Sequence, residues 1–467
     1  MKKLPLYLKI IFGLALGILW AFLSTQFGWN EFTLDWIDPF GMIFIKCLKF
    51  IAVPLVIFSI ISGIAGMKDI NSLGRIGAKT IFAYLITTVL AVGVGIVLVN
   101  FIKPGAMLDE EKRIENRIQY EIWVSDQNGT IQIADDKRFL DDPKYSSYIK
   151  EKIKSSETNK NNKITSGLTS KKDNGPLQFI IDIVPDNMFA AVSSNKLMLQ
   201  IIFISVFFGM ALLFIEETKA QPVIQFVIGA NEVFLKMVDW IMLAAPFFVF
   251  ALMAGVMAKM ASTIHELIEI FKGLGIYSIT VVVGLALMIF IVYPLILRVG
   301  GVRSLFYTSF FRKMAPAQFL AFSTSSSAAT LPVTMECVED RIGVPKKISS
   351  FVLPIGATVN MDGTSLYQSI AVIFLAQLHY IDLDLTQQLT IVLTATLASI
   401  GSAAVPSAGL VMLIMVLQSV GLNPMWIAII FPVDRILDMC RTTVNVTGDA
   451  TICTLIAKTE GELSESQ

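Results

Sequence analysis

Residues 424–449 read PMWIAIIFPVDRILDMCRTTVNVTGD and decide the fold, because they place charge at a regular spacing within a long apolar run. The polar and charged side chains recur at intervals of four, three, four and four residues: Asp434, Asp438, Arg441, Asn445 and Asp449. At about 100° per residue, these side chains share one stripe of a helix. We predict a buried helix whose polar stripe faces protein, water or a ligand.

The composition around this stretch is typical of a membrane protein. Hydrophobic residues make up 54% of the 467-residue chain and charged residues only 16%, whereas soluble domains carry about 25% charged residues. A spanning helix needs about 20 apolar residues, and a charge near the bilayer centre costs at least about 2.5–3.5 kcal/mol. Apolar blocks of that length precede the stretch at roughly 8–28, 40–66, 78–102, 178–215, 222–260 and 271–297. We expect an all-α integral membrane protein.

Basic residues in the connectors predict the orientation of these blocks. Lys2 and Lys3 precede the first block, and Arg75 lies between the second and the third. Arg298 and Arg312 follow the sixth. Placing all of them in the cytoplasm satisfies the positive-inside rule. The first apolar run is then a span entered from the cytoplasm rather than a cleaved leader, and we expect a multi-pass protein of the cell (inner) membrane.

Residues 103–176 differ from the rest of the chain because they are polar and charged. They include DEEKR at 109–113 and a run rich in Ser, Lys and Asn from 155 to 172. Such a composition offers too little apolar surface to fold by itself. The same orientation places this insert outside the cell, and we expect a largely disordered loop that connects two spans.

From residue 304 onward the apolar segments are interrupted near their middles. One break reads STSSSAATLP at 323–332, and the other reads SIGSAAVPS at 399–407. Each break leaves two arms too short to span a bilayer comfortably, which favours re-entrant helical hairpins. A helix that carries acidic residues follows each hairpin, with Asp362 in the first case. Paired interrupted segments are typical of transporters built from inverted repeats, whose substrate site lies between the repeats.

The polar stripe carries more negative than positive charge. An internal ion pair between Asp438 and Arg441 is one interpretation, but it leaves the other acids without a partner. Buried carboxylates in excess must be protonated or must hold cations, and carboxylate, amide and carbonyl oxygens suit a hard cation such as sodium. The planar guanidinium of Arg441 suits a carboxylate. We predict transport of an organic anion together with cations.

Four ordered motifs resemble those of the dicarboxylate/amino acid:cation symporters, the family of the glutamate transporters and their prokaryotic homologues. They are the serine tip at 325–327, NMDGT at 360–364, ASIG at 398–401 with Pro406, and DMCRT at 438–442 with NVTGD at 445–449. The resemblance covers nearly the whole chain except the insert. It implies eight transmembrane helices, two re-entrant helical hairpins, inverted repeats, a homotrimer and an elevator-type movement.

The resemblance also implies a division of the chain. Residues 1–102 would hold spanning helices 1–3, residues 103–176 the extracellular insert, and residues 177–300 spanning helices 4–6. Residues 301–460 would form the transport core, with the two hairpins and helices 7 and 8. Residues 461–467 would be a cytoplasmic tail.

Roles for individual residues follow from the same resemblance. The substrate-binding set would comprise Ser326 or Ser327, Thr364, Val405, Gly409, Asp438, Arg441, Thr442 and Asn445. Arg441 would bind the side-chain carboxylate of the substrate and Asp438 its amino group. One sodium site would use Gly356, Asn360, Asn445 and Asp449. A second would use Thr358, Ser399, Ile400 and Ser402. A third would use Tyr84, Thr87, Thr88, Asn360 and Asp362.

Two features refine this expectation within the family. Arg441 together with Asp438 resembles the members that carry acidic amino acids, so we expect sodium-coupled symport of L-aspartate and L-glutamate. Gln368 stands where potassium-countertransporting animal members carry a glutamate, which implies no potassium requirement. The chain also departs from many members, which carry an additional arginine near the pocket, in the first tip or beside Asp438. Here those positions hold Ser325 (or Thr324) and Met439.

Other functions are open from the residues alone. The same fold could carry C4-dicarboxylates or other amino acids, with sodium or proton coupling. An anion channel is another class, although a channel needs no amine-binding acid beside a carboxylate-binding arginine. An enzyme is disfavoured, since the sequence holds no activated nucleophile, metal-ligand cluster or phosphate loop. The net charge of +0 gives no sign of a nucleic-acid partner.

Overall fold

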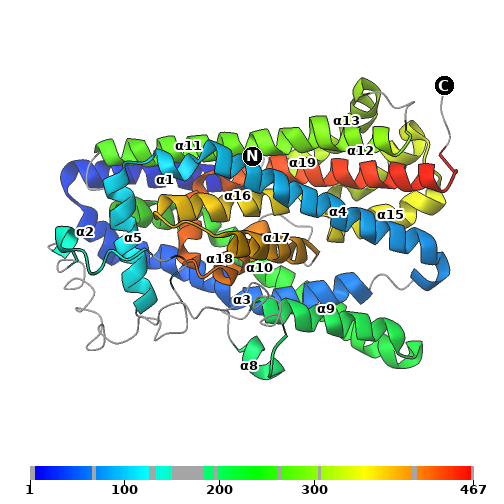
Figure 1. Ribbon diagram of the computed structural model, residues 1–467, viewed down its shortest axis with the longest axis horizontal. Helices are drawn as coiled ribbons and strands as arrows, with labels where there is room; N and C mark the ends of the chain where they lie inside the picture. The colour runs from blue at the N-terminus through cyan, green and yellow to red at the C-terminus, as the bar shows by residue number, and fades with distance from the viewer. Residues whose placement is uncertain are drawn as a thin grey trace, which may run out of the picture.

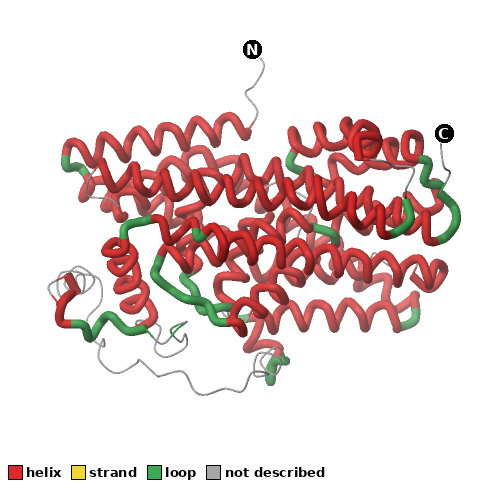
Figure 2. The backbone as a smooth tube through the Cα atoms, turned by 45° about the horizontal axis from the view of Figure 1, so that its top comes forward, coloured by secondary structure: helices red, strands yellow, loops and turns green. Residues whose placement is uncertain are grey.

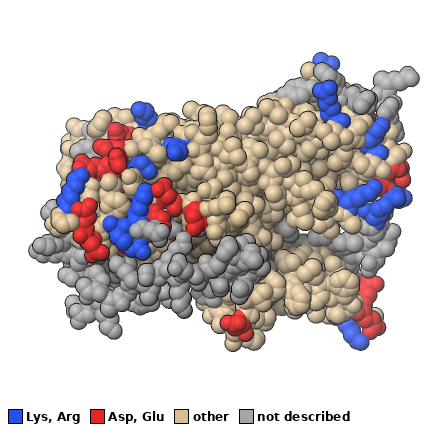
Figure 3. Space-filling view, viewed as in Figure 1, with Lys and Arg blue, Asp and Glu red and all other residues tan. Residues whose placement is uncertain are grey.

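The computed structural model is built from helices throughout its described part (Figure 1, Figure 2). It describes residues 6–65, 70–125, 137–146, 148–149, 184–193, 198–260, 264–302, 307–400 and 408–463, with Ile133 and Asp135. Figure 3 shows that charged side chains gather toward two ends of the visible face, with an uncharged band between them. This distribution suits a protein whose middle lies in an apolar solvent.

Long apolar helices from the first half of the chain pack together as one group. The helix α10 (Glu217–Met260) lies against α1 (Leu6–Phe27) and α3 (Asp38–Ala65). A short helix α2 (Asn30–Phe32) and a π-helical turn (Thr33–Ile37) connect α1 to α3. Close approach requires glycine, since a Cβ atom at Gly13 would lie 2.1 Å from the carbonyl oxygen of Pro246. The residues around 13 and 246 therefore fix the distance between α1 and α10.

The expected apolar block at 178–215 is divided in the structure. A short helix α8 (Met188–Val192) begins where the Asn187 side chain accepts hydrogen bonds from two backbone N–H groups. The helix α9 (Met198–Phe214) follows and packs against α3. The described residues of this block therefore form two helices, of which the first begins at the cap of Asn187.

A second group surrounds α16 (Asp362–Leu378), which is almost entirely buried. It contacts α4 (Ile70–Ile102), α11 (Ile264–Leu287) and α19 (Ile427–Thr459). A π-helical turn (Met288–Val292) and α12 (Tyr293–Val299) extend α11. Among the described residues, two helical stretches have the length and apolar character needed to cross a bilayer, Arg75–Met107 and Ile268–Val299.

Both interrupted segments contain pairs of helices that contact each other. In the first, α13 (Tyr307–Thr324) and α14 (Ser327–Glu336) meet at Ser325, whose φ of 52° lies in the left-handed region. Ser326 caps α14, because its Oγ accepts a hydrogen bond from the N–H of Ala329 at 3.2 Å. In the second, α17 (Leu385–Ile400) packs against α18 (Ala408–Ser419). The tip at 401–407 lies outside the described residues.

The backbone is also broken between the two hairpins. A π-helical turn (Cys337–Ile342) leads to α15 (Lys346–Val359), and Asn360 and Met361 separate α15 from α16 with non-helical dihedral angles. After α18, a 3₁₀ turn (Pro424–Trp426) begins the long α19. Since α15 and α16 both contact α19, the break at Asn360 lies beside the polar stripe.

The beginning of the polar insert is ordered, contrary to the expectation of a largely disordered loop. After a 3₁₀ turn (Pro104–Met107), α5 (Glu110–Ser125) docks on the end of α16, with the Nε of Arg113 2.8 Å from the carbonyl oxygen of Gln377. Arg117 is fully buried, and it pairs with Glu121 at 2.8 Å and with Asp135. A further 3₁₀ turn (Pro143–Tyr145) follows. The composition of the insert did not predict α5, because part of its buried surface consists of ion-paired side chains rather than apolar ones.

Candidate functional site

The five stripe residues of α19 are all buried, so the predicted orientation of the stripe is confirmed. Arg441 is fully buried, and Asp438, the most exposed of the five, retains only 6% of its surface. They face α16 and its neighbours rather than the outside of the molecule. Burying these polar and charged groups costs free energy, which hydrogen bonds or ion pairs with the protein or with ligands must offset.

Arg441 lies at the centre of the first half of the stripe. Its Nη2 donates to Asp438 Oδ1 at 2.6 Å, and its Nη1 lies 3.3 Å from Asp434 Oδ1. The guanidinium carbon stands 4.0 Å from the centroid of the Tyr367 ring. Within the described part of the chain, Nε and Nη1 of Arg441 make no hydrogen bond. Buried donors without acceptors are rare in native proteins and indicate a missing partner such as a ligand.

Two other elements bring polar groups next to this guanidinium. A Cβ atom at Gly409, at the start of α18, would lie 3.2 Å from Arg441 Nη1 and 3.1 Å from Thr364 Cγ2. Asn445 Nδ2 lies 3.4 Å from Thr364 Oγ1, while its Oδ1 accepts from the N–H of Gly363 at 2.8 Å. Four residues of the expected substrate set therefore meet in one place: Thr364, Gly409, Arg441 and Asn445.

Asp438 is more strongly paired than the sequence suggests. Its Oδ1 accepts from Arg441, and its Oδ2 accepts from Arg435 Nη1 at 3.2 Å. Thr442 Oγ1 donates to the carbonyl oxygen of Asp438 at 2.9 Å, which directs that hydroxyl along its own helix. The internal ion pair considered from the sequence is therefore present. Together with Asp434, this half of the stripe holds two acids and two arginines.

The second half of the stripe centres on Asp449. Its Oδ1 accepts from Asn360 Nδ2 at 2.9 Å. A Cβ atom at Gly356 would lie 2.6 Å from Asp449 Oδ1 and 2.4 Å from the hydroxyl oxygen of Tyr84. The backbone of α15 thus approaches the carboxylate closely, as the first expected sodium site requires. Asn360, Gly356 and Asp449 meet in the structure.

Asp362 lies beside this group, at the first position of α16. Its Oδ1 accepts from Thr88 Oγ1 at 2.9 Å, and its Oδ2 accepts from the Tyr293 hydroxyl at 2.9 Å. Thr87 Oγ1 lies 3.3 Å from Asn360 Oδ1, so Asn360 joins the surroundings of both carboxylates. The third expected sodium set therefore also meets in the structure.

Neither carboxylate, of Asp362 or of Asp449, has a basic partner among the residues that the structure describes. No ion pair involves Asp362 or Asp449 in the described part of the chain, and both are buried. The surrounding donor set is made of carboxylate, amide and hydroxyl oxygens with nearby backbone carbonyls, which suits a hard monovalent cation. No group of three His, Cys, Asp or Glu side chains comes together among the residues described. These residues therefore fit sodium better than a transition metal.

The second expected sodium set is not brought together by any contact of its described members. Thr358 is exposed, and its Oγ1 donates to the carbonyl oxygen of Ile355 at 3.0 Å. Ser399 is buried and donates to the carbonyl oxygen of Thr396 at 2.7 Å. Ser402 and Val405, like the side chain of Ile400, lie outside the described residues. Ser326 and Ser327 are both buried in the first tip, on a hairpin that packs against α19.

Sequence reasoning assigned no role to three residues that contact the stripe and its surroundings: Tyr293, Tyr367 and Arg435. Tyr293 is a lone hydroxyl in a long apolar run, which is a weak signal for a polar partner. Tyr367 lies about one and a half turns into α16 and offers no spacing signal. Arg435 lies three residues before Asp438, and this helical spacing could have predicted the pair.

Comparison with known proteins agrees with this geometry. The profile of the Sodium:dicarboxylate symporter family matches residues 6–459. A proton/sodium-glutamate symport protein of Bacillus caldotenax is 33% identical over all of this chain and 97% of its own length. The proton/glutamate-aspartate symporter of Escherichia coli K12 is 35% identical over 98% of this chain and 93% of its own.

An animal relative aligns over a similar extent. Excitatory amino acid transporter 3 of Oryctolagus cuniculus is 35% identical over 96% of this chain and 84% of its own length. Since the family profile and the relatives cover the hairpins, the stripe and the insert alike, the resemblance is not confined to one motif. The chain is a membrane protein that belongs to the Sodium:dicarboxylate symporter family.

Proposed function

We propose that this protein is a sodium-coupled symporter of the acidic amino acids L-glutamate and L-aspartate. The observation that carries the proposal is the buried guanidinium of Arg441 beside Thr364, Gly409 and Asn445, whose Nε and Nη1 have no hydrogen bond to any residue that the structure describes. A carboxylate of the substrate would supply a charged acceptor for these donors. The relatives named above are described as glutamate or glutamate-aspartate symporters, which supports the same substrate class.

The remaining substrate contacts would come from four elements around Arg441. Asp438 would bind the amino group, and Thr364, Thr442 and Asn445 would surround the main chain of the substrate. The tips would close the site from both sides, with Ser326 or Ser327 from the first hairpin and Val405 and Gly409 from the second. This arrangement is supported by the approach of Gly409 to the guanidinium.

Sodium would neutralise the carboxylates that lack a basic partner. Asp449 would hold one ion with Gly356, Asn360 and Asn445. Asp362 would hold another with Tyr84, Thr87, Thr88 and Asn360. A further ion would lie near Thr358, Ser399, Ile400 and Ser402. The bound cation would supply the positive charge that stabilises these buried carboxylates. Because the substrate site lies beside them, cation binding would favour substrate binding, and the cation gradient would drive transport. Gln368 supports a cycle without potassium.

The proposed architecture has eight spanning helices and two re-entrant hairpins arranged as inverted repeats. Residues 301–460 would move as the transport core in an elevator movement, against a scaffold from the first half of the chain, within a homotrimer. The protein would lie in the cell (inner) membrane, with lipid around the uncharged band in Figure 3. The exposed apolar side chains of α1, α4 and α10 support contact with lipid or with other copies.

A C4-dicarboxylate is the second candidate substrate. The observation that favours it is the pairing of both Asp438 oxygens with Arg441 and Arg435. A carboxylate that already accepts from two guanidinium groups has its charge balanced, and its attraction for an ammonium group is weaker. Coupling to protons is the matching alternative for the ion, since relatives are described as proton/sodium or proton symporters.

Uptake of labelled L-aspartate into proteoliposomes tests the proposal. We expect accumulation with an inward sodium gradient and none when choline replaces sodium. Succinate is offered in parallel under the same conditions. Accumulation of succinate without aspartate would favour the dicarboxylate candidate, and accumulation that follows a proton gradient without sodium would contradict sodium coupling.

A further inference from the structure

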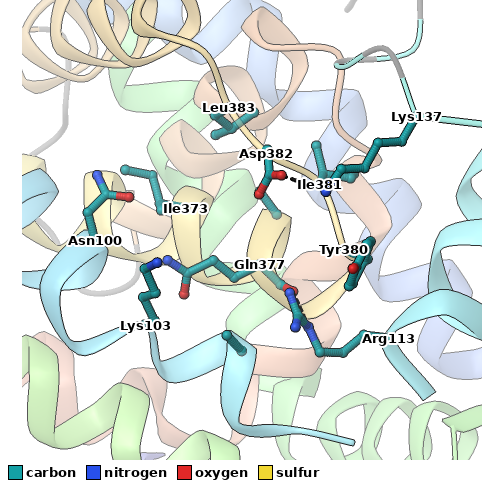
Figure 4. A pocket seen from close by; sticks show the side chains of 12 residues that line it. Asn100, Lys103, Arg113, Lys137, Ile373, Gln377, Tyr380, Ile381, Asp382 and Leu383 are labelled. Atoms are coloured by element: carbon teal, nitrogen blue, oxygen red, sulfur yellow. Dashed lines mark hydrogen bonds and ion pairs between the residues drawn. The ribbon is translucent and has the colours of Figure 1, made fainter. Parts of the chain in front are cut away.

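A cavity of about 370 Å³ lies at the end of α16 that is remote from the candidate site. It is enclosed by the end of α4, by α5 of the insert and by the segment that joins α16 to α17 (Figure 4). Gln377 in its wall lies 13 residues beyond Thr364 on α16, which corresponds to about 20 Å along the helix. The cavity is therefore separate from the site around Arg441. Its volume falls in the range of small-ligand pockets.

Positive charge dominates the wall of this cavity. The charged residues that line it are Lys103, Arg113, Lys137 and Asp382. Asp382 is already paired, because its Oδ2 lies 2.7 Å from Lys137 Nζ. Among the described residues, the exposed Lys103 and the half-buried Arg113 form no ion pair, although the carboxylates of Asp382 and Glu110 attract the charge of Arg113. A low-dielectric cleft lined by one sign of charge concentrates ions of the other sign.

The N–H donors of these two side chains are only partly used, and the guanidinium of Arg113 also lies over the Tyr380 ring, with its carbon 4.8 Å from the ring centroid. The Nε of Arg113 is used by the carbonyl oxygen of Gln377, but neither Nη group donates a hydrogen bond within the residues that the structure describes. The ammonium group of Lys103 likewise makes no ion pair there. Lys103 has a φ of 50°, a left-handed conformation that is uncommon for a residue other than glycine. A left-handed residue is common where a helix ends, and Lys103 stands between the end of α4 and the 3₁₀ turn that begins at Pro104.

The neutral residues of the wall favour a ligand with two separated anionic groups. Figure 4 shows Gln377 between Lys103 and Arg113, so the two cations face the cavity from different sides of this amide. A single compact anion would reach one of them well, whereas a short dicarboxylate can reach both. The planar fork of Arg113 suits one carboxylate, and the point charge of Lys103 suits the other.

We propose that this cavity is a second binding site, specific for small dicarboxylates, that lies about 20 Å from the transport site. It rests on the proposed function for the choice of ligand class, since acidic amino acids share the two carboxylates. The insert completes the site, because Arg113 and Lys137 both come from it. The site would hold substrate-like anions at the entrance side of the transport core and raise their local concentration.

Titration calorimetry with succinate tests this site in the full-length protein. The central site is disabled with Arg441→Ala, and binding is measured at low ionic strength. We expect succinate to bind this variant, and to bind at least about tenfold more weakly when Lys103→Gln and Arg113→Gln are added. The matched control adds Arg298→Gln and Arg312→Gln, which remove the same charge from exposed positions near the opposite end of the molecule, and it should leave binding unchanged.

Three results would overturn the proposal: no succinate binding, equal binding in the pocket pair and the control pair, or binding of inorganic phosphate in preference to succinate. If Arg441→Ala does not purify as a folded protein, wild-type protein in choline is titrated instead, because central binding requires sodium under the proposed function. Failure of the proposed function would appear separately, as a lack of sodium-dependent aspartate binding to wild-type protein.

Discussion

The two halves of the α19 stripe differ in how their charge is balanced. In the first half, Asp434 and Asp438 are paired with Arg435 and Arg441. In the second half, Asp449 and the neighbouring Asp362 receive hydrogen bonds from neutral groups, with no ion pair in the described part of the chain. Both halves of the stripe follow from the same helical spacing. Only the second half, with Asp449 and Asp362, needs a bound cation or proton to balance its charge.

The difference in charge balance suits the two halves of the stripe to different ligands. The balanced half can exchange one ion pair for another, because a substrate carboxylate can pair with Arg441 while the substrate amino group pairs with Asp438. The second carboxylate of an acidic amino acid then adds one negative charge. The unbalanced half is stable only with a bound cation or a proton. Asn445 lies between them, since it contacts Thr364 and the N–H of Gly363. The two occupations are therefore positioned to be coupled through α16 and α19.

The largest effect is expected from Arg441→Ala. Removal of a bidentate partner should weaken aspartate binding by about 3 kcal/mol or more, which is roughly a hundredfold or greater. Sodium binding at the second half should persist, because Asp449 and Asp362 keep their partners. Calorimetry with aspartate and then with sodium alone checks both points. Unaltered aspartate affinity would remove Arg441 from the substrate site.

Asp449→Asn tests the other half of the comparison. Loss of the carboxylate charge should raise the sodium concentration for half-maximal uptake by about tenfold or more, since the site loses its main attraction for a cation. The control is Asp434→Asn, which neutralises an acid of the same stripe that is paired with Arg441. The control should impair aspartate affinity and spare the sodium dependence. Equal sodium dependence in Asp449→Asn and wild type would argue against the assigned site.

A smaller effect is expected from Tyr293→Phe, which removes one donor from Asp362. A hydrogen bond to a charged group contributes about 1.5–3 kcal/mol, and a bound cation can compensate for part of this loss. Sodium affinity should therefore fall by about tenfold or less, with aspartate affinity at saturating sodium unchanged. Ser205→Ala provides a control, because its buried hydroxyl donates to the carbonyl oxygen of Ile201 on the same helix. Identical sodium affinity in Tyr293→Phe and this control would exclude a role for the Tyr293 hydroxyl.

The smallest effect concerns an ion pair at the end of α19, where solvent can screen the charges. Lys79 and Arg75 donate to Glu460 and lower the pKa of its carboxyl group. Because the folded pKa lies below the unfolded value of about 4.3, the stabilisation is complete above that value and is lost as the pH falls through the folded pKa.

Thermal unfolding of Glu460→Gln and wild type at two pH values measures this contribution. The melting temperature of the variant should be slightly lower at pH 7, and the two should coincide at a pH below the folded pKa. A difference that persists unchanged in acid would show that Glu460 acts through packing rather than charge.

The sequence predicted those parts of the site that lie on one element. The stripe of α19 follows from a spacing of 3.6 residues per turn, and the break at Asn360 follows from a run rich in polar and small residues within apolar helix. The contact of Tyr293 with Asp362 could not be predicted, because it depends on how α12 packs against α19 and so reaches the start of α16. The helix α5 was missed because its buried Arg117 is polar by composition and becomes compatible with burial only through Glu121 and Asp135.

The most direct test of the account is the affinity of wild-type protein for L-aspartate across a range of sodium concentrations, with choline holding the ionic strength constant. If unneutralised carboxylates require sodium before Arg441 can hold a substrate, the dissociation constant should fall by about tenfold or more for each tenfold rise in sodium. An affinity that does not change with sodium would contradict the coupling between the two halves of the stripe.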